Sequence, residues 1–303
     1  MLLAAGHDVV RIATRPDLEW FDAARQTDLV FNLCEGVAGV SRMEYAVASA
    51  LELTGVPYTG CSPWTMTVCH RKPLLNAALR DLGLPIPPSF VPDGRRPPRA
   101  DWPFPSIVKP AAEDASIGID QGSVVTTPQE LERRIAHVEA LHGTAFVQRY
   151  VTGREIAVGF VGSHTLPLSE IDFSRMPGDA WPIVSFSAKW HEDSPDYIGT
   201  EPRCPARVDD ALATRILEIA RAAWQAVEGR GYGRVDFRID EDGHPWVLEV
   251  NPNPDLSTDA GLARMARAYG WTYGDLVEQI VRTALETPTS ALTTPTHAGV
   301  TLT

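Results

Sequence analysis

Residues 231–254 most constrain how this chain can fold, because two apolar runs flank a turn-forming Asp-Glu-Asp-Gly cluster. Alternating apolar and polar side chains in both runs predict two antiparallel β-strands joined by that turn. Side chains alternate between the two faces of a strand, so Arg234 and Asp236 should share one face. Glu249 and Asn251 should share a face of the returning strand, with Asp236 opposite or diagonal to Glu249.

The other face of the predicted hairpin is apolar and carries Val235, Phe237, Ile239, Trp246, Leu248 and Val250. A hairpin with one buried face and one plainly solvated face is therefore an alternative interpretation. However, the second strand leaves through Asn-Pro-Asn-Pro, a stiff exit that fixes where Asn251 points. A solvated face would not need such an exit, so the pattern favours a functional polar face.

The polar face of the hairpin predicts a metal site. Two carboxylates packed side by side repel each other, and one takes up a proton unless a cation lies between them. The carboxylates of Asp236 and Glu249, with the amide oxygen of Asn251, are hard oxygen ligands that suit magnesium shared with phosphates. Arg234 is then placed to hold an anion close to the metal.

Composition restricts the class of protein. The chain has 303 residues, enough for two or three modest domains, and its 44% hydrophobic and 22% charged content is typical of a soluble globular protein. No apolar run approaches the length of a membrane span and no signal peptide is visible, so we expect no membrane partner. The net charge of −12 argues against binding to the phosphate backbone of a nucleic acid. The four cysteines lack metal-binding spacing, so we expect reduced thiols and a cytoplasmic protein.

The N-terminal part predicts an α/β layer with parallel strands. Residues 9–12 and 29–33 are typical of short buried strands, residues 43–53 predict a helix, and residues 56–60 predict a third strand. The first strand begins almost at the N-terminus, so we expect the start to be clipped relative to related proteins.

The central part of the sequence carries three features, and each of them is only a weak indication of function when taken alone. Residues 64–82 predict a helix with Lys72 on it, although a lone helical lysine is usually solvated. After a Pro- and Arg-rich loop at residues 93–105, a strand leads to Lys109 and to small residues at 111–119. The amides of that mobile loop could cover a triphosphate, but the sequence is not a Walker A motif and is a weak signal alone.

The remaining elements are predicted from caps and periodicity. Thr127 and Glu130 form a capping box that opens a helix running to about residue 141. Residues 146–151 and 155–161 predict two strands of a hairpin or near-hairpin, and a strand from residue 183 leads to Lys189, for which a surface position is equally expected. We further expect helices at 208–228, 258–269 and 273–286 and a disordered tail at 287–303.

The order of these pieces resembles the ATP-grasp superfamily and, within it, the D-alanine–D-alanine ligases. The resemblance extends from Gly6 to about Glu286, and its landmarks are Phe-Asn-Leu-Cys-Glu-Gly from residue 31, Leu-Thr-Gly-Val-Pro-Tyr-Thr-Gly from 53, Lys-Pro at 109, Gly-Arg-Val-Asp from 233 and Glu-Val-Asn from 249. It implies an α/β (α+β) ATP-grasp fold with a truncated N-terminal Rossmann-like layer. The implied domains are residues 1–63, residues 64–152 with the phosphate loop, and residues 153–286 with the metal site, followed by the tail.

The resemblance also implies roles for individual residues, residue by residue. For nucleotide binding it implies Lys72 and Lys109 on the ATP phosphates, Gln148, Arg149, Tyr150 and Val151 around adenine, and Glu155 on the ribose. For catalysis it implies Arg234 and Lys189 near the transferred phosphoryl group, with Ser116 in the phosphate loop. It also implies two bound magnesium ions, with manganese as an alternative, and Asp236, Glu249 and Asn251 as their ligands.

The sequence departs from the ligase family where the amino-acid substrates bind. The family glutamate that contacts the first amine would fall before the start of this chain. Ala115 and Ser116 stand where the family has a serine pair, and Trp190 stands where many members have tyrosine. The closing Ser-Leu aligns with Ala260 and Gly261. The candidate replacements for carboxylate contact are Ser257, Thr258 and Arg264, with helix capping as the alternative role of the first two.

The leading hypothesis is an ATP-dependent carboxylate–amine ligase that joins amino acids or small acids through an acyl phosphate, with substrates other than two D-alanines. The alternatives are D-alanine–D-alanine ligase proper, a nucleotide-binding protein without ligase activity, and an ATP-grasp kinase that releases its phosphorylated product. The expected partners are small amino acids or carboxylates, and a homodimer stays open.

Overall fold

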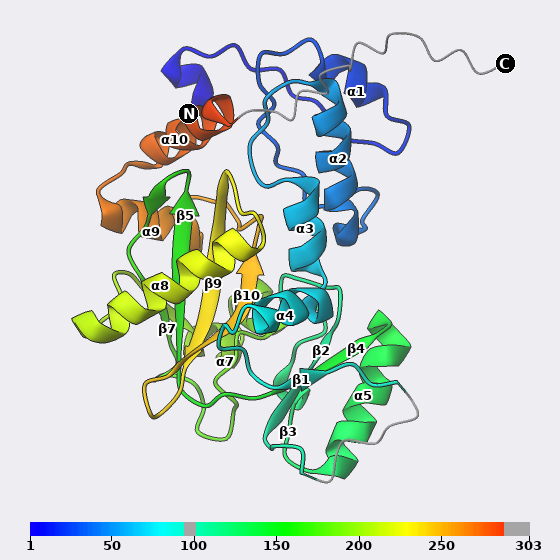
Figure 1. The fold of residues 1–303 in the computed structure, drawn as a ribbon, viewed down its shortest axis with the longest axis vertical. Coiled ribbons are helices and arrows are strands. Elements are labelled where there is room, and N and C mark those ends of the chain that lie inside the picture. Colours follow the sequence, from blue (N-terminus) through cyan, green and yellow to red (C-terminus); the bar gives the residue numbers. More distant parts are fainter. Residues whose placement is uncertain (94–100, 288–303) are drawn as a thin grey trace, which may run out of the picture.

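The computed structural model describes residues 1–93 and 101–287, and it contains two antiparallel sheets below an N-terminal helical layer (Figure 1). Most of the loop predicted at residues 93–105, and all of the predicted tail except Thr287, lie outside the described residues. Within the described ranges, no helix combines the length and the apolar character that a membrane crossing requires.

The larger sheet has six strands and forms the centre of the molecule. Its order is β10-β9-β5-β7-β8, with β6 paired to β5, and every pairing is antiparallel. The strands are β5 (Arg154–Val161), β6 (His164–Thr165), β7 (Ser169–Asp172), β8 (Glu201–Arg203), β9 (Tyr232–Ile239) and β10 (Pro245–Asn251).

Helices cover both faces of this sheet. Helix α8 (Asp210–Ala226) packs over Ile156 and Val158 of β5 and crosses the front of the sheet in Figure 1. Helices α9 (Gly261–Tyr269) and α10 (Tyr273–Glu286) pack on a second apolar cluster that includes Ala157. Since Ala157 alternates with Ile156 and Val158, the two helical layers lie on opposite faces.

The predicted central hairpin is confirmed, and β9 pairs with β10 so that Asp236 lies opposite Glu249 and Arg234 opposite Asn251. The predicted set of buried apolar residues on the second strand is wrong in part. A bulge between Val247 and Glu249 leaves Leu248 unpaired, so β10 buries Val247 and Val250 and leaves Trp246 half-buried. The extra residue changes which face each side chain points to on either side of it.

The smaller sheet has four strands, β1 (Ser89–Phe90), β2 (Ser106–Pro110), β3 (Val124–Val125) and β4 (Ala145–Arg149), in the order β1-β4-β2-β3. Helix α5 (Pro128–His142) packs on it through Leu131 and Val138, and the predicted Thr127–Glu130 capping box is present. The hairpin predicted for residues 146–151 and 155–161 is wrong, because β4 and β5 belong to different sheets.

The N-terminal layer contains short helices, η1 (Leu2–Ala5), α1 (Glu19–Ala24), η2 (Ser41–Met43) and α2 (Glu44–Thr54). The strand predicted at residues 9–12 is wrong, since Val9 and Val10 are 42% and 74% exposed and have no regular structure. The other two predicted strands contribute one isolated parallel bridge between Val30 and Tyr58. Ile12 and Val30 nevertheless pack against the apolar cluster of this layer, which contains Trp20, Ala24, Val47, Ala48, Leu51 and Tyr58.

Two further predicted elements are wrong, and the cause in each case lies in the residues at the element itself. The helix predicted at residues 64–82 is split into α3 (Pro63–His70) and α4 (Lys72–Asp81), with Arg71 at φ −106° and ψ 87° just ahead of Pro73. The predicted strand leading to Lys189 is instead helix α6 (Phe186–Trp190), because the Ser185 side chain caps the Ala188 amide. A second short helix, α7 (Pro195–Gly199), follows.

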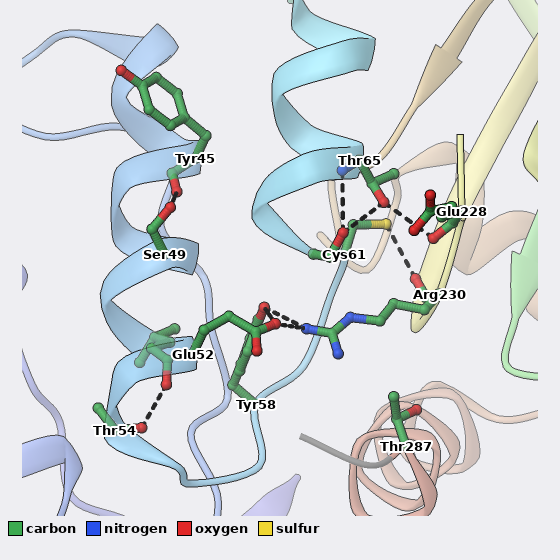
Figure 2. Close-up of polar contacts among 12 residues, drawn as sticks. Tyr45, Ser49, Glu52, Thr54, Tyr58, Cys61, Thr65, Glu228, Arg230 and Thr287 are labelled. Atoms are coloured by element: carbon green, nitrogen blue, oxygen red, sulfur yellow. Dashed lines mark hydrogen bonds and ion pairs between the residues drawn. The ribbon is translucent and has the colours of Figure 1, made fainter. Parts of the chain in front are cut away.

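A buried polar contact joins the N-terminal layer to the larger sheet (Figure 2). Glu52 of α2 accepts hydrogen bonds from the Tyr58 hydroxyl at 2.7 Å and from the Arg230 guanidinium at 2.6 Å. The Cys61 thiol donates to the Arg230 carbonyl oxygen at 3.1 Å. Arg230 lies just before β9, so these contacts position the strand that carries Arg234 and Asp236 relative to α2.

Gly153, between the two sheets, should be intolerant of a side chain. Its φ is +140°, and a Cβ there would lie 1.9 Å from the Ile239 carbonyl oxygen. We expect Gly153→Ala to lower the free energy of unfolding by about 1–3 kcal/mol from backbone strain alone. The collision with Ile239 adds to this cost, and urea denaturation measures the sum.

Gly178→Ala is the matched control, because a Cβ at that position meets no atom within 4 Å. Equal urea midpoints for the two variants would contradict the proposed close approach of Gly153 to β9.

Candidate active site

Strand β9 presents an ion pair on the face that α9 covers. The Arg234 guanidinium binds the Asp236 carboxylate through two parallel hydrogen bonds, Nε to Oδ1 at 2.6 Å and Nη2 to Oδ2 at 2.8 Å. Bidentate pairs of this kind fix the plane of both groups. Asp236 is only 8% exposed, so its carboxylate depends on neighbouring protein groups rather than on water.

Glu249 lies opposite Asp236 in the sheet, and the two carboxylates have different pKa values because their surroundings differ. Burial raises the pKa of Asp236 to about 6 against the opposing effect of Arg234, and Glu249 adds to the increase. Burial would also raise the pKa of Glu249, but nearby cations lower it to about 2. As the pH falls, Asp236 therefore takes up a proton before Glu249 does, as expected for neighbouring carboxylates. Those cations are Lys189, Lys72, Arg234 and Lys109.

Two part-buried lysines from different elements act electrostatically on the same carboxylate. Lys109 is the fourth residue of β2 and donates from Nζ to Oε1 of Gln148 at 3.1 Å. Burial lowers the pKa of Lys109 to about 8, with Glu249 opposing the decrease. Lys72 begins α4, burial lowers its pKa as well, and Glu249 again opposes. The centre therefore combines four cationic side chains with two carboxylates, a balance that suits a polyphosphate with divalent cations.

The phosphate loop predicted at residues 111–119 packs against the segment that carries Lys189. Ala115 and Ser116 both have left-handed backbone angles, φ 48° and 61°. The Ser116 hydroxyl donates to the Val184 carbonyl oxygen at 2.8 Å, and the Trp190 indole donates to the Ala115 oxygen at 3.3 Å. The proton of Ser116 is thus engaged by the protein, whereas Lys189 is among the cations that act on Glu249.

The segment expected around adenine is mostly buried. Gln148 contacts Lys109, the Tyr150 hydroxyl donates to the Pro182 oxygen at 3.2 Å, and Val151 is 2% exposed. Arg149 differs from the others, because its guanidinium lies over the Trp246 ring, 5.7 Å from the ring centroid. Its side chain therefore packs on an aromatic ring of β10.

Arg238 is a residue of this region that the sequence analysis did not single out. It is 3% exposed, pairs with Glu155 at 2.9 Å and donates to the Gly153 carbonyl oxygen at 3.0 Å. Glu155 thus has a cationic partner in register on the next strand. Alternation along β9 was the available signal, because Arg238 follows Arg234 and Asp236 on the same face.

Asn253 is a second residue that the sequence analysis missed as an individual contact. Its backbone amide donates to Oδ1 of Asn251 at 3.0 Å, and its side-chain amide donates to the Cys34 carbonyl oxygen at 3.2 Å and to Glu44 at 3.3 Å. One lone pair of the Asn251 oxygen is therefore used, and the other is free for a cation.

The donor set of this centre suits magnesium. Asp236 and Glu249 bring two carboxylates together, and the pKa of Asp236 is raised to about 6 by burial and by the nearby Glu249. A hard divalent cation held by these carboxylates would offset their charges. Asn251, which pairs with Arg234 in register, would offer a third oxygen.

The chain matches known proteins over most of its length. Residues 98–282 match the family model described as D-ala D-ala ligase C-terminus. The chain is 33% identical over 267 residues to the uncharacterized protein y4sG of Sinorhizobium fredii, covering 86% of this chain and 76% of that protein. It is 30% identical over 285 residues to a D-alanine–D-alanine ligase of Gluconobacter oxydans, covering 92% of this chain and 89% of that enzyme.

Solved structures agree on the fold. A D-alanine–D-alanine ligase from Bacillus anthracis complexed with ATP superimposes with a TM-score of 0.70 at 23% identity, covering 89% of this chain and 82% of that one. Another structure of that ligase gives a TM-score of 0.75 at 22% identity, with 93% and 88% covered. The chain therefore belongs to the D-alanine–D-alanine ligase family of ATP-grasp proteins, a family of ATP-dependent ligases that form C–N bonds.

Proposed function

We propose that the protein activates a small carboxylic or amino acid with ATP and joins the acyl group to an amine. The observation that carries this proposal is that the positive charges of Lys72, Lys109 and Lys189 all act on the carboxylate of Glu249 and lower its pKa. Lys72 and Lys109 are part-buried and Lys189 is exposed, and three lysines near acidic oxygens suit an anion that itself carries divalent cations. A nucleotide triphosphate has that composition.

Magnesium would be held by Asp236, Glu249 and Asn251, with two ions expected and manganese as an alternative. When bound, the ions supply charge neutralisation at the β- and γ-phosphate oxygens. Lys72 and Lys109 would hold the phosphates from the opposite side. Gln148, Tyr150 and Val151 would line the adenine site, with the Arg149 backbone beside them, and Glu155 would bind the ribose.

The chemistry follows from the poor reactivity of a carboxylate, whose leaving group in acyl transfer would be oxide. Attack of a carboxylate oxygen on the γ-phosphorus forms an acyl phosphate and releases ADP. An amine then attacks the acyl carbon and displaces inorganic phosphate. Arg234 and Lys189 would stabilise the charge on the transferred group, and the loop with Ser116 would exclude water.

The substrates proposed here differ from two D-alanines, because Ala260 and Gly261 stand at the start of α9 where the family has a serine and a leucine. Ala260 is the N-cap of α9 without any side-chain hydrogen bond, so the expected capping by Ser257 or Thr258 is wrong. A Cβ on Gly261 would lie 3.6 Å from the Arg234 guanidinium, so this position borders the centre. Arg264 remains a candidate for carboxylate contact. Synthesis of D-alanyl-D-alanine is the second candidate, favoured by the named activity of several relatives.

We also propose that the protein is cytoplasmic and acts on small molecules. Its four cysteines are all free thiols, which suits a reducing compartment. The net charge of −12 disfavours a nucleic-acid partner. A homodimer stays a prediction.

Trapping with hydroxylamine tests the acyl-phosphate step. With ATP, magnesium and a panel of amino acids and small carboxylic acids, wild-type protein should yield a hydroxamate from at least one acid. Glu249→Gln should reduce this by at least about a hundredfold, because it removes a metal ligand. Glu241→Gln, in the exposed turn of the same hairpin, is the matched control and should retain wild-type rates.

Each alternative has its own outcome in this experiment. ATP binding without any hydroxamate would indicate a nucleotide-binding protein without ligase activity. A stable phosphorylated product with no amide formed would indicate a kinase. Wild-type rates in Glu249→Gln would refute the metal assignment.

Metal binding should weaken as the pH falls through the Asp236 pKa of about 6. Below that pH a proton occupies Asp236 and competes with the cation, so the Mn²⁺ affinity measured by electron paramagnetic resonance should fall roughly tenfold per pH unit. Glu249, with a pKa of about 2, does not titrate there. Asp236→Asn should abolish this dependence.

Asp242→Asn is the control for a second group of possible metal ligands, Asp240, Asp242 and His244, at the exposed turn. It should keep the wild-type pH profile. A profile that disappears in Asp242→Asn but survives in Asp236→Asn would assign the measured ion to the turn and contradict the proposal.

A further inference from the structure

Arg238 joins three segments that border the proposed nucleotide site. Its Nη2 lies 2.9 Å from Oε2 of Glu155 on β5, the strand next to β9 (Figure 1). Its Nη1 donates to the Gly153 carbonyl oxygen at 3.0 Å, and its Nη2 also donates to the Pro182 carbonyl oxygen. Because Arg238 is only 3% exposed, these contacts fix the orientation of its planar guanidinium.

The ion pair leaves one oxygen of the Glu155 carboxylate without a protein donor. The contact with Arg238 is closest at Oε2, and within residues 1–93 and 101–287 no hydrogen bond reaches Oε1. The Glu155 side chain is 19% exposed, whereas that of Arg238 is 4% exposed. A carboxylate oxygen that has no partner and remains accessible can accept a hydrogen bond from a ligand. The pair therefore presents an oriented acceptor that the described protein groups do not use.

The pair lies one step along the sheet from the proposed metal ligands. Glu155 is in register with Arg238. Two residues further along β5, Ala157 is in register with Asp236. Residues two apart on a strand share a face and lie about 6.8 Å from each other. The charges of Glu155 and Arg238 also act on Lys109, the first raising its pKa and the second lowering it. A nucleotide with its phosphates at Lys109 and Asp236 would thus have its sugar close to the pair.

We propose that Arg238 is a positioning residue that holds the Glu155 carboxylate for a ribose hydroxyl, so that the protein selects ribonucleotides over deoxyribonucleotides. The inference rests on the proposed function, in which Glu155 binds the ribose. The ion pair stabilises the negative charge of Glu155 and limits the rotation of its carboxylate. A ribose hydroxyl then donates to Oε1, and a deoxynucleotide lacks this charge-assisted hydrogen bond.

A guanidinium suits this role better than an ammonium group does. Arg238 reaches its three acceptors from one rigid plane, and its guanidinium carbon lies 5.5 Å from the ring centroid of Tyr150 and 5.1 Å from that of Phe173. A lysine has a single nitrogen and no plane to stack on the rings. Arg238→Lys therefore keeps the buried positive charge but releases the orientation of Glu155.

Calorimetric titration with ADP, 2′-deoxy-ADP and 3′-deoxy-ADP, in the presence of magnesium, tests the inference without ligase turnover. Wild-type protein should bind ADP at least about tenfold more tightly than at least one deoxy analogue, because a hydrogen bond to a charged group is lost. Arg238→Lys should reduce this preference to about threefold or less. Arg154→Lys is the matched control and should keep the wild-type preference. Arg154 pairs with Glu170 at 2.7 Å from the opposite face of the same strand.

A double-mutant cycle separates positioning from a general structural role. If Arg238 acts through Glu155, then Glu155→Gln removes the preference for ADP and the addition of Arg238→Lys changes it no further. An equal loss of affinity for all three nucleotides in Arg238→Lys would indicate a structural role alone and overturn the inference. Arg238→Met is the second variant, because it removes the buried charge if the lysine variant fails to fold, and it should lower the preference in the same direction.

The titration and the hydroxamate assay fail independently. If no acid yields a hydroxamate, the proposed ligase function fails, and the preference among the three nucleotides still decides the role of Arg238. Equal affinity of wild-type protein for ADP and both deoxy analogues would overturn the inference and leave the ligase proposal intact. If none of the three nucleotides binds, both proposals are refuted.

Discussion

The bidentate pair between Arg234 and Asp236, with Glu249 across from it, is the interaction on which the rest of the centre depends. Asp236 is buried and Arg234 and Glu249 are part-buried in the larger sheet, so protein groups or a ligand must balance much of their charge. The lysines provide much of that balance from two other elements. Lys109 comes from the smaller sheet and Lys72 from the start of α4. The centre therefore exists only when both sheets and the N-terminal helices are packed together.

The bulge in β10 determines which face of the sheet the Glu249 carboxylate points to. In a regular strand Val247 and Glu249, two residues apart, would face the same side, so one of them would be on the wrong face of the sheet. The bulge lets Val247 and Val250 both enter the core under α8 while Glu249 stays opposite Asp236. This one irregularity therefore allows the apolar side chains of β10 to pack in the core while the ionised Glu249 side chain stays on the opposite face.

The parts of the structure that the sequence predicts well are local. The pairing of Asp236 with Glu249 follows from strand alternation around a short turn, and the α5 cap follows from Thr127 and Glu130. The bulge was not predictable, because Leu248 is apolar and fits either face. The separation of β4 and β5 into two sheets also has no local signal, since only a short turn with Gly153 lies between them. Arg238 and Pro182 meet only through tertiary packing, so no local pattern predicts their contact.

The break between α3 and α4 has a consequence for how a nucleotide would enter. Lys72 follows that break, its amide donates to the Ala111 carbonyl oxygen at 3.0 Å, and its ammonium donates to the Glu113 carbonyl oxygen. Both contacts are to the loop at residues 111–119, so the position of this loop and the position of the Lys72 side chain depend on each other. If Lys72 binds a nucleotide phosphate as proposed, phosphate binding would also change how firmly the loop is attached to α4.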